Sequence, residues 1–145
     1  MATTKTRINI SGIPELNKAI GKLKTDIFAV LGEAVLAGSD IIRDDAKTKA
    51  RKKSGELAGG IVSTVTWDRK APVAWAGAGM DAAKNSVFVK YSANGKRYYY
   101  PSSIEYGHKG APAYPFMRPA MDANKAAVRK AVRDRVKAVV EGVKP

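Results

Sequence analysis

The first half of the chain carries one long stripe of apolar residues at three- and four-residue intervals. The stripe comprises Leu16, Ile20, Leu23, Ile27, Val30, Leu31, Ala34, Val35, Ile41, Ile42, Ala46 and Ala50. This spacing gathers them on one face of an α-helix, and Pro14 suits the first helical turn, where its missing N–H costs nothing. The pattern predicts an amphipathic helix over residues 14–53 after an extended arm at 1–12. Three internal glycines weaken it, which leaves open a kink or a division into two helices.

The middle of the chain, residues 61–100, has the alternation and the β-branched composition of short strands. In its first strand, Ile61, Ser63, Val65 and Trp67 share one face. The four candidate strands are residues 61–67, 73–76, 87–91 and 97–100. Asn94-Gly95 predicts a hairpin with a type I′ turn before the last of them, because both residues tolerate positive φ. We expect a small antiparallel sheet of about four strands.

The last third of the chain returns to helical spacing after a loop. A short helical turn at 101–106 is predicted to end at Gly107, and residues 107–116 form a proline- and glycine-containing loop. The helix predicted at 118–142 has one face made of Met121, Asn124, Val128, Val132, Val136 and Val139, and Val143 continues the same spacing. Two helices packed on a small sheet make an α+β fold, and 145 residues fit a single domain, 1–145.

The charge balance adds a strong preference for anionic partners. The chain has 26 Lys and Arg against 13 Asp and Glu, a net charge of +13. The positive electrostatic potential of such a chain attracts nucleic acid or acidic protein surfaces, and salt weakens this attraction. The candidate contacts lie in two basic clusters: Lys49, Arg51, Lys52, Lys53, Arg129 and Arg133. Contact with phosphates, without sequence readout, is therefore one open interpretation.

Candidate chemistry is sparse. The chain has no cysteine and one histidine, and it lacks the metal-binding and phosphate-loop motifs, so we predict no metal, no cofactor and no catalytic residue. Glu105 and His108 could form an acid–base pair of a nuclease, but an exposed loop histidine explains His108 more simply. No apolar run reaches the ~18 residues of a membrane span, and no secretory signal is present, so we expect a non-enzymatic protein made in a reducing cytoplasm.

Several short motifs follow one another in a recognisable order. The first is Ile10-Ser11-Gly12-Ile13-Pro14-Glu15-Leu16, and Ser54-Gly55-Glu56-Leu57 follows the long helix. The most specific are Ile104-Glu105-Tyr106-Gly107 and Pro115-Phe116-Met117-Arg118-Pro119-Ala120. Together, from about residue 10 to residue 142, the series resembles a long-tailed bacteriophage family of tail-completion, head–tail joining and minor tail protein Z-like subunits. The chain departs from the family pattern in two places: Ser54 stands where threonine is usual, and His108 follows Gly107 where threonine is common.

The resemblance implies a structural subunit of the virion neck or tail top, assembled in the host bacterial cytoplasm. Such a subunit would form a ring, expected to have six copies, between the head-side connector and the tail-tube or tail-terminator proteins. DNA would pass through the ring without sequence readout, and no membrane is involved. The assembly residues that the motifs imply are Glu105, Tyr106, Gly107, His108, Pro115, Phe116, Arg118 and Pro119. A non-specific nucleic-acid-binding protein that uses its basic helix faces is the alternative.

The motif residues also have a physical interpretation of their own. Gly107 can adopt backbone angles closed to other residues and so end a helix abruptly. Phe116 offers an apolar anchor. Arg118 stands at a helix start, where the macrodipole disfavours a cation, so we predict that it pairs with a carboxylate, that of Glu105. The alternative is that Arg118 is merely solvated.

Overall fold

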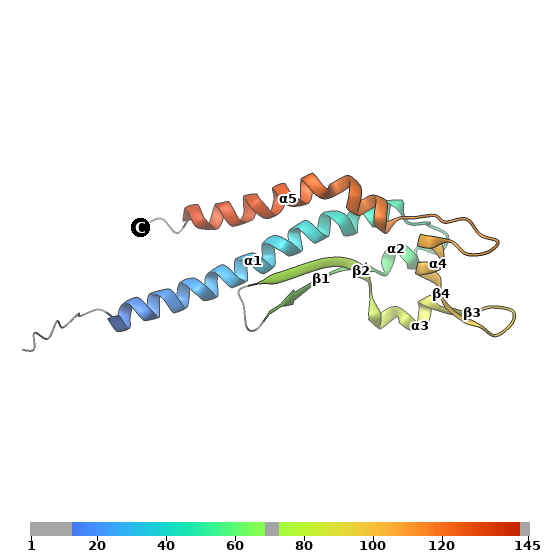
Figure 1. The fold of residues 1–145 in the computed structure, drawn as a ribbon, viewed down its shortest axis with the longest axis horizontal. Coiled ribbons are helices and arrows are strands. Elements are labelled where there is room, and N and C mark those ends of the chain that lie inside the picture. The colour runs from blue at the N-terminus through green and yellow to red at the C-terminus, as the bar shows by residue number, and fades with distance from the viewer. Residues whose placement is uncertain (1–12, 69–72, 143–145) are drawn as a thin grey trace, which may run out of the picture.

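The computed structural model describes residues 13–68 and 73–142, so the predicted arm at 1–12 lies outside the described residues. The chain is α+β, as predicted (Figure 1). Its elements are α1 (Ile13–Lys49), α2 (Glu56–Gly59), β1 (Ile61–Trp67), β2 (Ala74–Met80), η1 (Ala82–Lys84), α3 (Asn85–Phe88), β3 (Val89–Tyr91), β4 (Arg97–Tyr99), α4 (Tyr100–Tyr106) and α5 (Met117–Gly142). Among these residues, no helix combines the length and apolar composition that crossing a bilayer requires.

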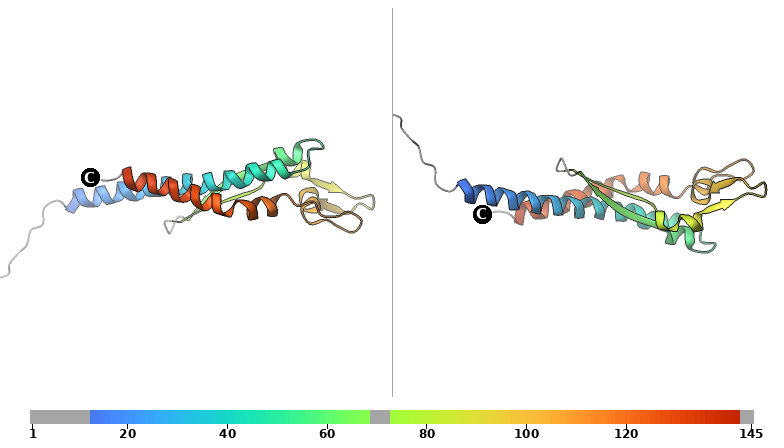
Figure 2. Two further views of the ribbon diagram at one scale, coloured as in Figure 1. Left: turned by 90° about the horizontal axis from the view of Figure 1, so that it is seen from above. Right: turned by 90° about the horizontal axis from the view of Figure 1, so that it is seen from below.

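The two long helices form an antiparallel pair that gives the molecule its elongated shape (Figures 1 and 2). α1 is one unbroken helix of 37 residues, so the division that its glycines left open does not occur. Gly38 instead lets α5 approach closely, because a Cβ there would lie 3.0 Å from a methyl of Val128 and 3.1 Å from one of Val132. α1 ends at Lys49, four residues before the predicted end, and the basic residues 51–53 lie outside it.

The predicted four-stranded sheet is wrong in its arrangement, because the strands form two separate two-stranded sheets. In the first, β1 pairs antiparallel with β2, with Ile61 opposite Met80, and this ribbon runs beside α1 (Figure 2). In the second, β3 pairs antiparallel with β4. Residues 82–88 between the sheets are helical, so the third strand begins at Val89 rather than at 87. The Asp81 side chain starts this helical segment by accepting a hydrogen bond from the Ala83 N–H at 2.9 Å.

The hairpin between β3 and β4 confirms the Asn-Gly signal but not the turn type. Gly95 has a positive φ of 73°, whereas no residue other than glycine has one among the described residues. The Ser92 N–H donates to the Lys96 carbonyl, and the Gly95 N–H donates to the Ser92 carbonyl, both at 2.9 Å. The loop therefore has three residues, a length usually built as a type I turn ending in a left-handed residue. The two-residue type I′ turn is wrong.

The main apolar core lies at the end of the helix pair where α1 stops and α5 begins. Its buried members are Ala46, Ala50, Leu57, Ile61, Phe116 and Ala120. They lie in α1, α2, β1 and α5 or, for Ala50 and Phe116, directly beside the ends of the long helices, so the short middle elements dock onto one end of the pair. On β1, Thr64 and Thr66 are exposed while Ile61 is buried, as the predicted alternation requires. On α5, Ala120 rather than Met121 faces this core, and Met121 is exposed.

Candidate functional site

A densely hydrogen-bonded polar site surrounds the Glu105 carboxylate, in the last turn of α4. Glu105 is buried, with 5% of its surface exposed. It accepts hydrogen bonds from the backbone N–H groups of Phe116 at 2.8 Å, Met117 at 3.0 Å and Arg118 at 3.0 Å. The first N–H groups of a helix have no partner within it, and they carry partial positive charge. Glu105 therefore caps the start of α5 from a different element.

The same contacts set the protonation state of Glu105. Burial alone would raise the pKa of this carboxyl, because it disfavours the charged form. The backbone N–H groups of Phe116, Met117 and Arg118, with the Arg118 side chain, outweigh burial and hold the pKa of Glu105 below its ordinary value. The carboxylate is thus an anion at neutral pH whose hydrogen bonds are made within the chain.

A pH titration of stability tests this assignment. The lowered pKa of folded Glu105 means that its stabilisation is present above the unfolded pKa, about 4.3, and is lost as the pH falls through the folded pKa. We expect the free energy of unfolding to fall as the pH drops below about 5, and Glu105→Gln to flatten that dependence. Urea unfolding at a series of pH values measures both slopes. Equal slopes for the two proteins would contradict the cap.

Arg118 makes the ion pair with Glu105 that the sequence predicted. Its Nε lies 3.1 Å from Oε1 of Glu105, and its second terminal nitrogen donates to the Glu105 carbonyl at 2.8 Å. The guanidinium also stacks over the ring of Tyr106, 4.7 Å from the ring centre. The Arg118 side chain remains 51% exposed, and Tyr106 is exposed as well. The pair therefore joins a buried anion to a fixed cation and ring at the surface.

Gly107 ends α4 as predicted, and the space around it admits no side chain. Its φ of 72° and ψ of 177° lie in a region that is essentially restricted to glycine. A Cβ would lie 2.6 Å from the backbone nitrogen of Ala113 and 3.0 Å from the carbonyl oxygen of Ala111. The Tyr114 N–H then donates to the Ile104 carbonyl at 2.7 Å. The chain after Gly107 thus folds back against α4 and delivers Phe116 to Glu105.

The remaining motif residues divide between core and surface. Phe116 is buried in the core, as predicted, with 1% of its surface exposed. Pro115 is exposed and Pro119 is half-buried. His108 is exposed, and its backbone pairs with that of Ala111 in an isolated bridge. The structure brings Glu105, Gly107, Phe116 and Arg118 together; we call these four residues the Glu105 junction. His108 lies outside it.

The predicted basic residues do not form one surface. Lys49 pairs with Asp45 on the preceding turn of α1, and Arg51 stacks over the Tyr114 ring at 4.5 Å. Lys52 and Lys53 are exposed beyond the end of α1. Arg129 and Arg133 lie on α5, whose Val128 contacts α1 at Gly38. Since Gly38 is 11 residues before Lys49, the two clusters are about 16 Å apart along the helix axis.

Some features of the site were missed from the sequence. The sequence predicts Arg118 as a partner of Glu105, but it does not indicate the three backbone donors. The Glu-to-Phe spacing alone does not indicate a cap made from another helix. Asn124 lies on the predicted face of α5, and its side chain donates to the Asp45 carboxylate at 2.6 Å and to the Ala120 carbonyl at 2.8 Å, contacts that the sequence does not indicate. This bond fixes α5 against α1 one turn beyond the core.

The described residues hold no group of three or more acidic or histidine side chains positioned for a metal ion. Comparison with protein-family models, with curated proteins and with solved structures finds no match to this chain. The interpretation of the Glu105 junction therefore depends on its own geometry and on the motifs that form it.

Proposed function

We propose that this chain is a structural virion subunit of the neck or tail top of a long-tailed bacteriophage. It completes the tail and joins it to the head as part of an oligomeric ring around the DNA channel. Its partners are further copies of itself, a head-side connector, and a tail-tube or tail-terminator protein. The role is non-enzymatic.

The observation that supports this proposal most is the meeting of two motifs at the Glu105 junction. The Glu-Tyr-Gly and Pro-Phe-Met-Arg-Pro segments carry the resemblance, and Glu105 bonds directly to the start of α5. A junction held by backbone bonds keeps its shape without a ligand, as a docking surface needs. Tyr106 and Arg118 lie at its surface, and both residue types are enriched among the strongest contributors to protein interfaces.

A shallow hollow beside the junction offers a place for a partner side chain. Its volume is about 190 Å³, and Pro101, Tyr106, Met117 and Arg118 are among the residues that line it. Most of its surface is apolar, while Arg118 supplies a charged rim. An apolar centre with a polar rim is the usual composition of a protein–protein contact. The hollow is thus better suited to a partner side chain than to a substrate.

Arg118→Ala tests the proposed role while leaving the backbone cap of Glu105 in place. We expect a folded subunit, destabilised by about 1 kcal/mol, that no longer joins heads to tails. Infectious yield and electron microscopy of particles, in the phage that encodes the chain, measure the effect. Arg135→Ala is the matched control, because Arg135 is exposed elsewhere on α5. Wild-type yield from Arg118→Ala, or equal losses from both variants, would contradict the proposal.

Non-specific nucleic-acid binding remains the second candidate, and α5 carries the observation that favours it. Arg129 and Arg133 are four residues apart on one face, and neither has an ion-pair partner among the described side chains. Lys130 and Lys137 on the same helix are paired with Asp134 and Glu141. These ion pairs reduce the positive electrostatic potential along α5. A mobility shift of duplex DNA at ~150 mM salt separates the candidates, because binding driven only by phosphates falls steeply with salt.

A further inference from the structure

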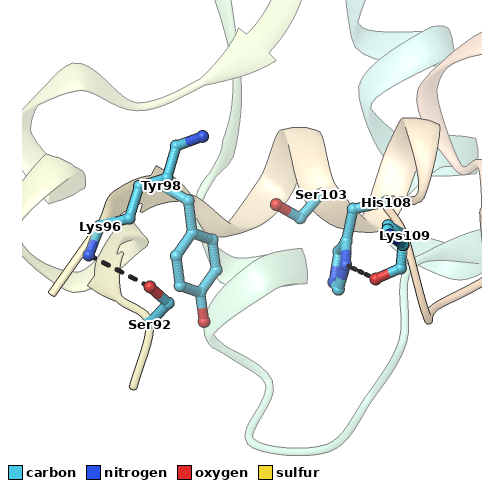
Figure 3. A pocket seen from close by; sticks show the side chains of 6 residues that line it. All are labelled: Ser92, Lys96, Tyr98, Ser103, His108 and Lys109. Atoms are coloured by element: carbon cyan, nitrogen blue, oxygen red, sulfur yellow. Dashed lines mark hydrogen bonds between the residues drawn. The ribbon is translucent and has the colours of Figure 1, made fainter. Parts of the chain in front are cut away.

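A second hollow, larger than the one at the junction, lies at the hairpin end of the molecule (Figure 3). Its volume is about 410 Å³, and it is lined by Ser92, Lys96, Tyr98, Ser103, His108 and Lys109. The hairpin supplies the first three residues, α4 supplies Ser103, and the loop after Gly107 supplies the last two. In Figure 3 the Tyr98 ring stands between Ser92 and Lys96 on one side and Ser103 and His108 on the other. Three separate segments therefore form one site.

The side chains of this hollow offer hydrogen-bond donors and positive charge. None of the lining residues is acidic, and Lys96 and Lys109 have no ion-pair partner within the described part of the chain. The Ser92 hydroxyl oxygen accepts the Lys96 backbone N–H at 3.1 Å, which leaves its own proton for an outside acceptor. The Tyr98 hydroxyl adds another donor. Most of the exposed lining is apolar, and its polar groups favour a ligand that has oxygen acceptors and negative charge.

The ring of His108 contacts the backbone of its neighbour. Its Nδ1 lies 3.0 Å from the Lys109 carbonyl oxygen, which can only accept a hydrogen bond. The contact is a hydrogen bond in the tautomer that carries its proton on Nδ1, and it places the ring beside the loop that carries Lys109. His108, which lies outside the Glu105 junction, therefore lines a different site.

We infer that this hollow binds carboxylate side chains from an acidic segment of a partner protein. The hydroxyls of Ser92 and Tyr98, with the Lys96 and Lys109 ammonium groups at the rim, match one or two carboxylates, whereas the Ser103 hydroxyl already donates to the Tyr99 carbonyl at 3.3 Å. A volume of about 410 Å³ admits side chains rather than a whole domain. A nucleic-acid strand would need a row of cations along its phosphates, whereas Lys96 and Lys109 border a single hollow. This names the partner chemistry of the proposed assembly subunit and in that respect rests on the proposed function.

Binding to the purified full chain tests the inference without any assembly. The probe is a short fluorescein-labelled peptide of alternating glutamate and glycine, followed by fluorescence anisotropy at ~100 mM salt. We expect the double variant Lys96→Gln with Lys109→Gln to bind about tenfold more weakly. The matched control, Lys125→Gln with Lys137→Gln, removes the same charge from α5, where both lysines are exposed, and is expected to change binding less than about twofold.

A charge-neutral variant separates a built site from general attraction. Tyr98→Ala removes the ring that stands in the hollow, and we expect it to weaken peptide binding with no change in net charge. Equal weakening by both lysine pairs, or wild-type affinity of Tyr98→Ala, would overturn the inference. So would an absence of peptide binding, or tighter binding of an oligothymidylate that the Lys96 and Lys109 variant abolishes. Because Arg118 is not in this hollow, failure here and failure of the Arg118→Ala assembly test are distinguishable.

Discussion

Glu105→Ala is expected to lower the free energy of unfolding by about 2–4 kcal/mol, a large part of the 5–15 kcal/mol typical of a domain. The substitution removes the acceptor for three N–H groups at the start of α5 and the counter-ion of Arg118. The Phe116 N–H is buried, so water cannot easily replace the lost carboxylate. Denaturant unfolding followed by circular dichroism measures the change.

Glu141→Ala is the control for Glu105→Ala. Its carboxylate is 57% exposed and pairs with Lys137 one turn earlier in α5, and we expect a loss below about 0.5 kcal/mol. A Glu105→Ala variant as stable as the control would mean that the helix start is satisfied in another way. That outcome would remove the structural basis assigned to the Glu105 junction.

Gly107→Ala is expected to destabilise the chain by about 3 kcal/mol or more. A side chain at these backbone angles costs about 1–3 kcal/mol by itself, and the new Cβ would also press on the backbone at Ala113. Backbone atoms cannot move aside as the end of a flexible side chain can. The loop that brings Phe116 to Glu105 must therefore shift, and α5 loses part of its cap.

Gly110→Ala separates the cost of the backbone angles from the cost of crowding around the new Cβ. Gly110 also has a positive φ, 91°, but a Cβ there meets no atom within 4 Å. We expect it to show only the backbone cost, about 1 kcal/mol. Thermal unfolding of the two variants side by side gives the difference that crowding at Gly107 adds. Equal stabilities would show that the close approach of Ala113 relaxes at little cost.

Local signals in the sequence predicted much of the fold. Apolar residues at three- and four-residue intervals predicted both long helices, α1 and α5, because each helix buries one face against the other. β-branched alternation gave β1, and Asn94-Gly95 gave the β3–β4 hairpin. Gly107 and the Glu105–Arg118 pair followed from known demands of helix ends. These features depend on neighbours in the sequence or on the physics of one helix terminus.

The rest depended on contacts between distant segments. Nothing in the strand sequences indicates that β1–β2 and β3–β4 form separate sheets, because that division follows from the helical segment at 82–88 between them. The Asp45–Asn124 bond joins residues 79 positions apart. The hollow lined by Lys96 and Lys109 combines three segments, none of which carries a recognisable motif alone. Such features need the tertiary arrangement.

The antiparallel helix pair gives the molecule two unlike ends. α1 begins and α5 finishes at one end, while the hairpin and both hollows lie toward the other (Figure 1). The two ends of such a subunit present different surfaces. Copies placed side by side in the same orientation would therefore form a layer with two chemically different faces. In the proposed ring, the two faces would therefore meet different neighbours.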